Sequence, residues 1–126
     1  MLRKFLGLMY RRTVLAGINS SKGLKDAFLN EEAFQVQVLL CLVLVPLAWV
    51  VAEDYQQLLM LLSALFLVMI VELLNTGIEI VVDRIGLEFH QLSGRAKDIG
   101  SAAVSLSMLL FVIVWGAIIA LNFGFI

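Results

Sequence analysis

The residues Val71-Glu72-Leu73-Leu74-Asn75-Thr76-Gly77-Ile78-Glu79-Ile80-Val81-Val82-Asp83-Arg84 place carboxylates within and just beyond an apolar segment. At about 100° per residue, three polar side chains, Asn75, Glu79 and Asp83, fall within roughly 60° of Glu72 and form one stripe with it. An ionised group inside a bilayer is costly, so such a stripe faces a protein cavity rather than lipid and commonly has a function. The stretch therefore predicts a membrane helix that carries a polar site near one end.

The composition of the chain also indicates a membrane protein. Of the 126 residues, 62% are hydrophobic, which is more apolar surface than one small soluble core can bury. Three predicted spans, residues 33–52, 58–82 and 101–123, each approach or exceed the roughly 20 residues that cross a bilayer as a helix. We therefore expect an all-α membrane protein with three transmembrane helices in a single domain over residues 1–126.

The positive charges are unevenly distributed along the chain. Six of the nine Lys and Arg residues precede the first span, three lie between the second and third, and the connection 53–57 has none. The positive-inside rule then predicts that the N-terminus and a loop over residues 83–100 are cytoplasmic. Because the net charge is only -1, no general attraction to nucleic acid is indicated.

Residues 1–30 are predicted to form amphipathic helices on the membrane surface. Apolar residues are interspersed with Arg3, Lys4, Arg11 and Arg12, as suits a helix in the headgroup plane with its cations toward anionic lipid. The segment 17–21, Gly-Ile-Asn-Ser-Ser, predicts a break before a second short helix that leads into the first span. No cleaved leader is expected, since Tyr10-Arg11-Arg12 interrupts the apolar part early.

The polar groups are expected to meet at the cytoplasmic side of the membrane. The second span runs inward, so Glu72 lies within its last turns and Glu79 and Asp83 lie closer to water. Carboxylates at this spacing repel one another unless a proton, a cation or a phosphate-bound metal intervenes. Mg²⁺ commonly takes one or two carboxylates plus substrate phosphates. The segment 86–98 adds cations and glycines on the same side.

Simpler interpretations of these polar residues stay open. Glu72 could merely hydrogen-bond a neighbouring helix. Glu79 and Asp83 could form a solvated helix end, and Arg95 and Lys97 could serve only to set the topology. A lone His90 without a second histidine or cysteine at ligand spacing is by default a loop histidine. The segment 94–98 lacks the spacing of a P-loop, so it does not indicate a nucleotide site of that kind.

The third span carries residues that are suited to helix packing. Trp115 lies too deep for the interfacial aromatic belt and is expected to pack inside the protein. Small residues at the start of the span allow helices to approach closely: Ser101, Ala102, Ala103, Ser105 and Ser107. Because three thin helices make a poor cavity by themselves, the sequence favours a small symmetric oligomer.

Three segments resemble the prokaryotic diacylglycerol kinase family: residues 71–79 quoted above, Val82-Asp83-Arg84-Ile85-Gly86, and Leu92-Ser93-Gly94-Arg95-Ala96-Lys97-Asp98. The likeness extends to Lys22-Gly23-Leu24 and Asn30-Glu31 and covers nearly the whole chain. It implies a homotrimeric lipid kinase of the bacterial inner membrane, with a cytoplasmic active site. Such an enzyme moves the γ-phosphoryl group of magnesium ATP to the hydroxyl of diacylglycerol and yields phosphatidic acid.

The resemblance also implies roles for individual residues. Glu72 matches the base that takes the proton of the lipid hydroxyl, and Glu31 and Glu79 match the ligands of the Mg²⁺ that carries the nucleotide phosphates. The implied ATP-binding positions are Arg12, Asn19, Glu31, Glu79, Glu88, Phe89, His90, Lys97 and Asp98. The implied lipid-binding positions are Arg12, Ala33, Phe34, Gln35, Leu58, Glu72, Asn75 and Ser101.

Two departures from the family pattern affect the predicted lipid cleft and surface helix. Gln35 and Gln37 stand where the pattern has an arginine and a glutamate, and Asn19-Ser20-Ser21 replaces a segment that commonly carries aromatic residues. Three rival functions therefore remain: a kinase of the same fold acting on undecaprenol, a proton-coupled transporter in which Glu72 binds proton and substrate alternately, and a non-catalytic assembly factor.

Overall fold

The computed structural model describes residues 1–124, which form four helices. These are α1 (Leu2–Asn30), α2 (Glu32–Val51), α3 (Tyr55–Ile85) and α4 (Gln91–Asn122). Helices α2, α3 and α4 are each long and apolar enough to cross a membrane, which confirms the prediction of an all-helical, multi-pass membrane protein. Helices α3 and α4 have 31 and 32 residues, so at about 1.5 Å per residue they exceed the hydrocarbon core and extend into the polar region.

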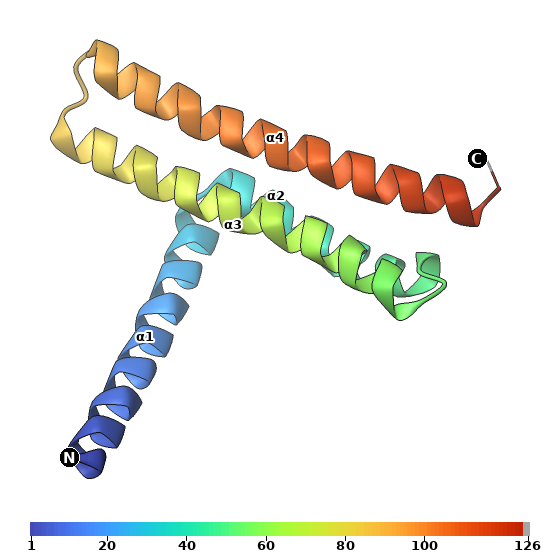
Figure 1. The fold of residues 1–126 in the computed structure, drawn as a ribbon. Coiled ribbons are helices and arrows are strands. Elements are labelled where there is room, and N and C mark those ends of the chain that lie inside the picture. Colours follow the sequence, from blue (N-terminus) through green and yellow to red (C-terminus); the bar gives the residue numbers. More distant parts are fainter. Residues whose placement is uncertain (125–126) are drawn as a thin grey trace.

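Helix α3 is central to the arrangement. It packs along α4 on one side and along α2 on the other, and it runs antiparallel to both (Figure 1). Helices α2 and α4 scarcely meet. Helix α1 contacts α2 near their junction, and its N-terminal part projects away from the other three helices (Figure 1). Any site built from a single chain must therefore centre on α3.

The best-packed region lies at the α2–α3 connection, at the opposite end of α3 from the polar stripe. Its buried members are Ala48, Val51, Leu58, Leu61, Ala64, Trp115 and Ile118. The indole Nε1 of Trp115 donates a hydrogen bond to the carbonyl oxygen of Leu61 at 3.1 Å, so the prediction that Trp115 packs inside the protein is confirmed. Because the indole N–H has an acceptor, burying this polar group costs little free energy.

A polar connection closes the same end of the molecule. Asn122 Nδ2 donates to the carbonyl oxygen of Val51 at 2.7 Å and to Gln57 Oε1 at 2.8 Å, and Gln57 Nε2 donates to Asn122 Oδ1 at 3.1 Å. The carbonyl of Val51 is one of the four at the end of α2 that lack a partner within their own helix. One asparagine thus joins the ends of three helices.

The N-terminal segment differs from its prediction. Helix α1 is continuous from Leu2 to Asn30, so the predicted break at 17–21 is wrong. The hydroxyl of Ser21 donates to the carbonyl of Gly17 at 2.9 Å, so this serine bonds within the helix instead of capping a new one. Glycine, asparagine and serine weaken a helix by less than about 1 kcal/mol each, which does not suffice to end it. The location of this helix on the membrane surface stays a prediction.

The connection after α3 is also shorter than expected. Residues 83–100 were expected as a loop, but only residues 86–90 lie outside α3 and α4. His90 Nδ1 accepts a hydrogen bond from the backbone N–H of Leu92 at 3.2 Å and so caps the start of α4. The polarity that suggested a loop belongs to helix ends that extend beyond the apolar spans.

Candidate active site

Glu72 is buried in α3, in the half of the helix that the sequence predicts to lie toward the cytoplasm. Only 7% of its surface is exposed. Gln37 of α2 is a polar neighbour of its carboxylate, and Glu79 and Glu31 lie within electrostatic range. Since Glu31 sits at the junction of α1 and α2, three elements bring polar groups to one buried acid.

The polar stripe of α3 occurs as the periodicity indicates. Asn75 is 8% exposed, Glu79 is half-buried and Asp83 is exposed, so burial decreases toward the end of the helix. Asn75 Nδ2 donates to Glu79 Oε1 at 3.1 Å. Asn75 Oδ1 is buried without a hydrogen-bond partner. Asn75 thus holds the Glu79 carboxylate on the side of Glu72 and keeps one buried acceptor free.

Lys97 joins this stripe from α4. Its Nζ lies 2.6 Å from Asp83 Oδ1, and both side chains are partly exposed. The sequence places both residues near the cytoplasmic end, but it does not indicate the pair, which depends on how α4 folds back along α3. A partly exposed pair contributes little to stability, so an anion could compete with Asp83 for this ammonium group.

A pocket of about 320 Å³ lies beside the pair at the α3–α4 connection. Four of the residues predicted to bind ATP line it: Glu88, Phe89, His90 and Lys97. The ring of Phe89 is 95% exposed and therefore free to contact a planar group. The structure thus brings these four predicted residues together in one depression, whereas Asp98, the residue after Lys97, is exposed and does not line it.

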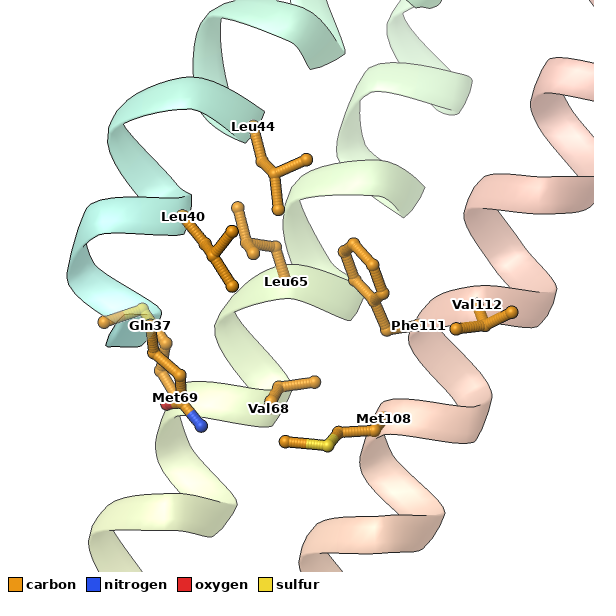
Figure 2. A pocket seen from close by; sticks show the side chains of 9 residues that line it. All are labelled: Gln37, Leu40, Leu44, Leu65, Val68, Met69, Met108, Phe111 and Val112. Atoms are coloured by element: carbon orange, nitrogen blue, oxygen red, sulfur yellow. The ribbon is translucent and has the colours of Figure 1, made fainter. Parts of the chain in front are cut away.

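An apolar pocket of about 250 Å³ lies between α2, α3 and α4 (Figure 2). Its apolar lining residues are Leu40, Leu44, Leu65, Val68, Met69, Met108, Phe111 and Val112. Gln37 closes one end, beside Met69, and its Oε1 is buried without a hydrogen-bond partner (Figure 2). Since Gln37 also reaches Glu72, a hydrocarbon-lined space ends next to the buried acid.

Several residues implied in lipid or nucleotide binding are not brought to Glu72. Arg12 and Asn19 of α1 are exposed. Leu58 is buried in the core near the α2–α3 connection, roughly 20 Å from Glu72 along the helix axis. Ala33 and Ser101 are exposed, and of the lipid-binding set on α2 Phe34 is buried and Gln35 half-buried. A single chain therefore assembles only part of the predicted site.

The carboxylates supply only part of the ligands that a divalent cation needs. Among residues 1–124, no three His, Cys, Asp or Glu side chains lie close enough together to enclose a metal ion. Glu31 and Glu79 offer hard oxygen donors of the kind that Mg²⁺ prefers. Mg²⁺ usually takes one or two carboxylates and completes its shell with water and substrate phosphates, so these residues fit an ion that arrives with a nucleotide.

Comparison with known proteins identifies the family. The sequence profile of prokaryotic diacylglycerol kinase matches residues 18–119. A protein named diacylglycerol kinase from Haemophilus influenzae is 47% identical over 116 residues, which cover 88% of this chain and 98% of that protein. Proteins of the same name from Escherichia coli and Helicobacter pylori are 45% and 38% identical and cover 91% and 85% of this chain. The chain therefore belongs to the prokaryotic diacylglycerol kinase family.

Proposed function

We propose that the protein phosphorylates diacylglycerol to phosphatidic acid with ATP at the cytoplasmic face of a bacterial inner membrane. The observation that carries this proposal is the buried Glu72, which lies between an apolar pocket closed by Gln37 and the hydrogen-bonded pair of Asn75 and Glu79. The relatives named diacylglycerol kinase support the choice of lipid.

Glu72 acts as the general base of the reaction. The tails of the lipid occupy apolar space within the membrane and hold its free hydroxyl at the depth of the carboxylate, which provides the orientation that phosphoryl transfer needs. Glu72 takes the hydroxyl proton as the oxygen bonds to the γ-phosphorus. The bond from that phosphorus to the β,γ-bridging oxygen breaks, and the products are phosphatidic acid and ADP.

The nucleotide lies on the α3–α4 side of Glu72. Its γ-phosphate reaches Lys97, whose ammonium group leaves Asp83 and pairs with a phosphate oxygen. The adenine ring contacts the pocket that Phe89 and His90 line. Glu31 and Glu79 hold Mg²⁺, and Asn75 orients Glu79 by the bond from Nδ2. The ion, when bound, neutralises part of the phosphate charge.

A kinase of the same fold acting on undecaprenol is the second candidate. Gln37 is neutral, and the pocket that it closes is otherwise lined by hydrocarbon and sulfur atoms, which suits an alcohol whose tail lacks ester groups. Direct competition between the two alcohols distinguishes these assignments.

The test is magnesium- and ATP-dependent phosphorylation of diacylglycerol in mixed micelles, with undecaprenol as a competing acceptor. Wild-type protein should form phosphatidic acid, and Glu72→Gln should reduce kcat at least about a hundredfold because the base is lost. Glu53→Gln, an exposed carboxylate in the α2–α3 connection, is the matched control and should retain wild-type activity.

Other outcomes of this assay have definite meanings. Preferential phosphorylation of undecaprenol would move the assignment to the second candidate. Folded protein that consumes no ATP with either lipid would exclude a kinase and favour the transporter, and full activity in Glu72→Gln would remove Glu72 from the reaction.

A further inference from the structure

Helix α4 approaches the polar stripe of α3 closely at Gly100. This glycine is buried, and it faces Asn75. A β-carbon at position 100 would lie 2.2 Å from Asn75 Oδ1 and 3.3 Å from Asn75 Cγ. Since interiors are close-packed and such a contact is far inside van der Waals distance, the side chain of Asn75 would have to move. The observed position of Asn75 therefore requires glycine at 100.

The contact also sets the orientation of the Asn75 amide. Its oxygen lodges against Gly100, and this leaves Nδ2 to donate to Glu79 Oε1 at 3.1 Å. An ionised carboxylate only accepts hydrogen bonds, so the reversed amide would place oxygen against oxygen. The bond to Glu79 thus selects this orientation, and the missing side chain at Gly100 leaves room for the oxygen.

The tight contact is specific to this turn of α4. A β-carbon added at Gly94 or Gly116 of α4, or at Gly77 of α3, would meet no atom within 4 Å. Lys97, one turn before Gly100, pairs with Asp83 of α3. Two successive turns of α4 therefore contact the polar stripe. Lys97 does so through its charge, and Gly100 does so because it has no side chain.

We propose that Gly100 is a positioning residue for phosphoryl transfer: it admits Asn75 against α4 and thereby fixes the amide N–H on Glu79. The inference rests on the proposed kinase function. Gly100 touches no reacting atom in this scheme and acts only through Asn75. Loss of the glycine should consequently impair the step that depends on Glu79 more than it impairs lipid binding.

The kinetic test compares Gly100→Ala with Gly116→Ala, both normalised to folded protein. Gly100→Ala should lower kcat at least about tenfold and raise the Mg²⁺ concentration for half-maximal rate, with KM for the lipid within about twofold of wild type. Gly116→Ala should keep all three values within about twofold. Folded Gly100→Ala with wild-type kcat and Mg²⁺ dependence would overturn the proposal, and so would an equal loss in Gly116→Ala.

A stability cycle tests the contact without relying on activity. Gly100→Ala should lower the unfolding midpoint in the wild-type background, but it should have little effect in Asn75→Ala, where the smaller side chain leaves room for the methyl group. If Gly100→Ala alone does not fold, recovery of folding in the double variant supports the contact. If Gly100→Ala lowers the unfolding midpoint as much in the Asn75→Ala background as in wild type, the contact is refuted. An inactive wild type would contradict the kinase function, while the cycle would still decide the contact.

Discussion

At the scale of single residues, the environment of Glu72 determines what the site can do. The acid is 7% exposed and has a neutral amide, Gln37, as a polar neighbour. A buried acceptor without a partner costs free energy, and both Gln37 Oε1 and Asn75 Oδ1 are of this kind. Both belong to residues beside the proposed base or its neighbour Glu79, so this cost is concentrated at the proposed site.

Gln37→Leu tests the contribution of this amide. The change keeps the size of the side chain but removes the amide beside Glu72, and a polar neighbour stabilises the charged form of an acid. We expect kcat with diacylglycerol to fall about tenfold or more while the fold stays intact. The variant Gln56→Leu, an exposed glutamine at the other end of α3, serves as control. Unchanged kcat in Gln37→Leu would show that Glu72 needs no polar neighbour from α2.

At the scale of elements, the antiparallel pair of α3 and α4 builds the site. The opposite end of the molecule, where Asn122 joins the ends of α2, α3 and α4, stabilises this pair. The sequence predicted the three spans well because long apolar runs leave few alternatives in a bilayer. It did not predict the helical ends at residues 83–85 and 91–100, or the continuous α1. Those segments are polar, and local propensities of a fraction of a kcal/mol do not decide whether such a segment is helix or loop.

Asn122→Ala should destabilise the protein without impairing catalysis. The variant leaves the last carbonyl of α2, that of Val51, without its donor and unpairs Gln57, so we expect a loss of about 1–2 kcal/mol in the free energy of unfolding. Unfolding in mixed detergent measures it, with Gln56→Ala as an exposed polar control. Because Asn122 lies at the opposite end from Glu72, kcat per folded protein should not change; equal stability of the two variants would contradict the prediction.

At the scale of the whole molecule, one chain brings together only part of the predicted site. The N-terminal part of α1 projects from the other helices (Figure 1). Arg12 and Asn19 are exposed, and large apolar side chains remain exposed on α2, α3 and α4. Lipid covers some of these faces. We propose that copies of the chain cover the others in a homotrimer, so that α1 of one copy approaches α3 of another.

Mixing two inactive variants tests this arrangement. If the site is shared, subunits with Glu72→Gln and subunits with Arg12→Ala should recover activity when they are unfolded together and reconstituted, because some sites then receive both intact residues. Activity of the mixture should exceed the sum of the separate preparations, and the mass of the particle in micelles should be that of three chains. If the mixture shows no gain over that sum, then either Arg12 and Glu72 of the same chain form one site or Arg12 does not belong to the site.

The sequence by itself determined the membrane class, the three spans, the polar stripe from Glu72 to Asp83 and the packing of Trp115. Each of these depends on composition or helical periodicity, which act over one or a few turns. Only the tertiary structure decided that Gln37 meets Glu72, that Lys97 pairs with Asp83, and that Gly100 admits Asn75. These contacts join different helices, and the periodicity of one helix does not specify the register or rotation in which it packs against its neighbour.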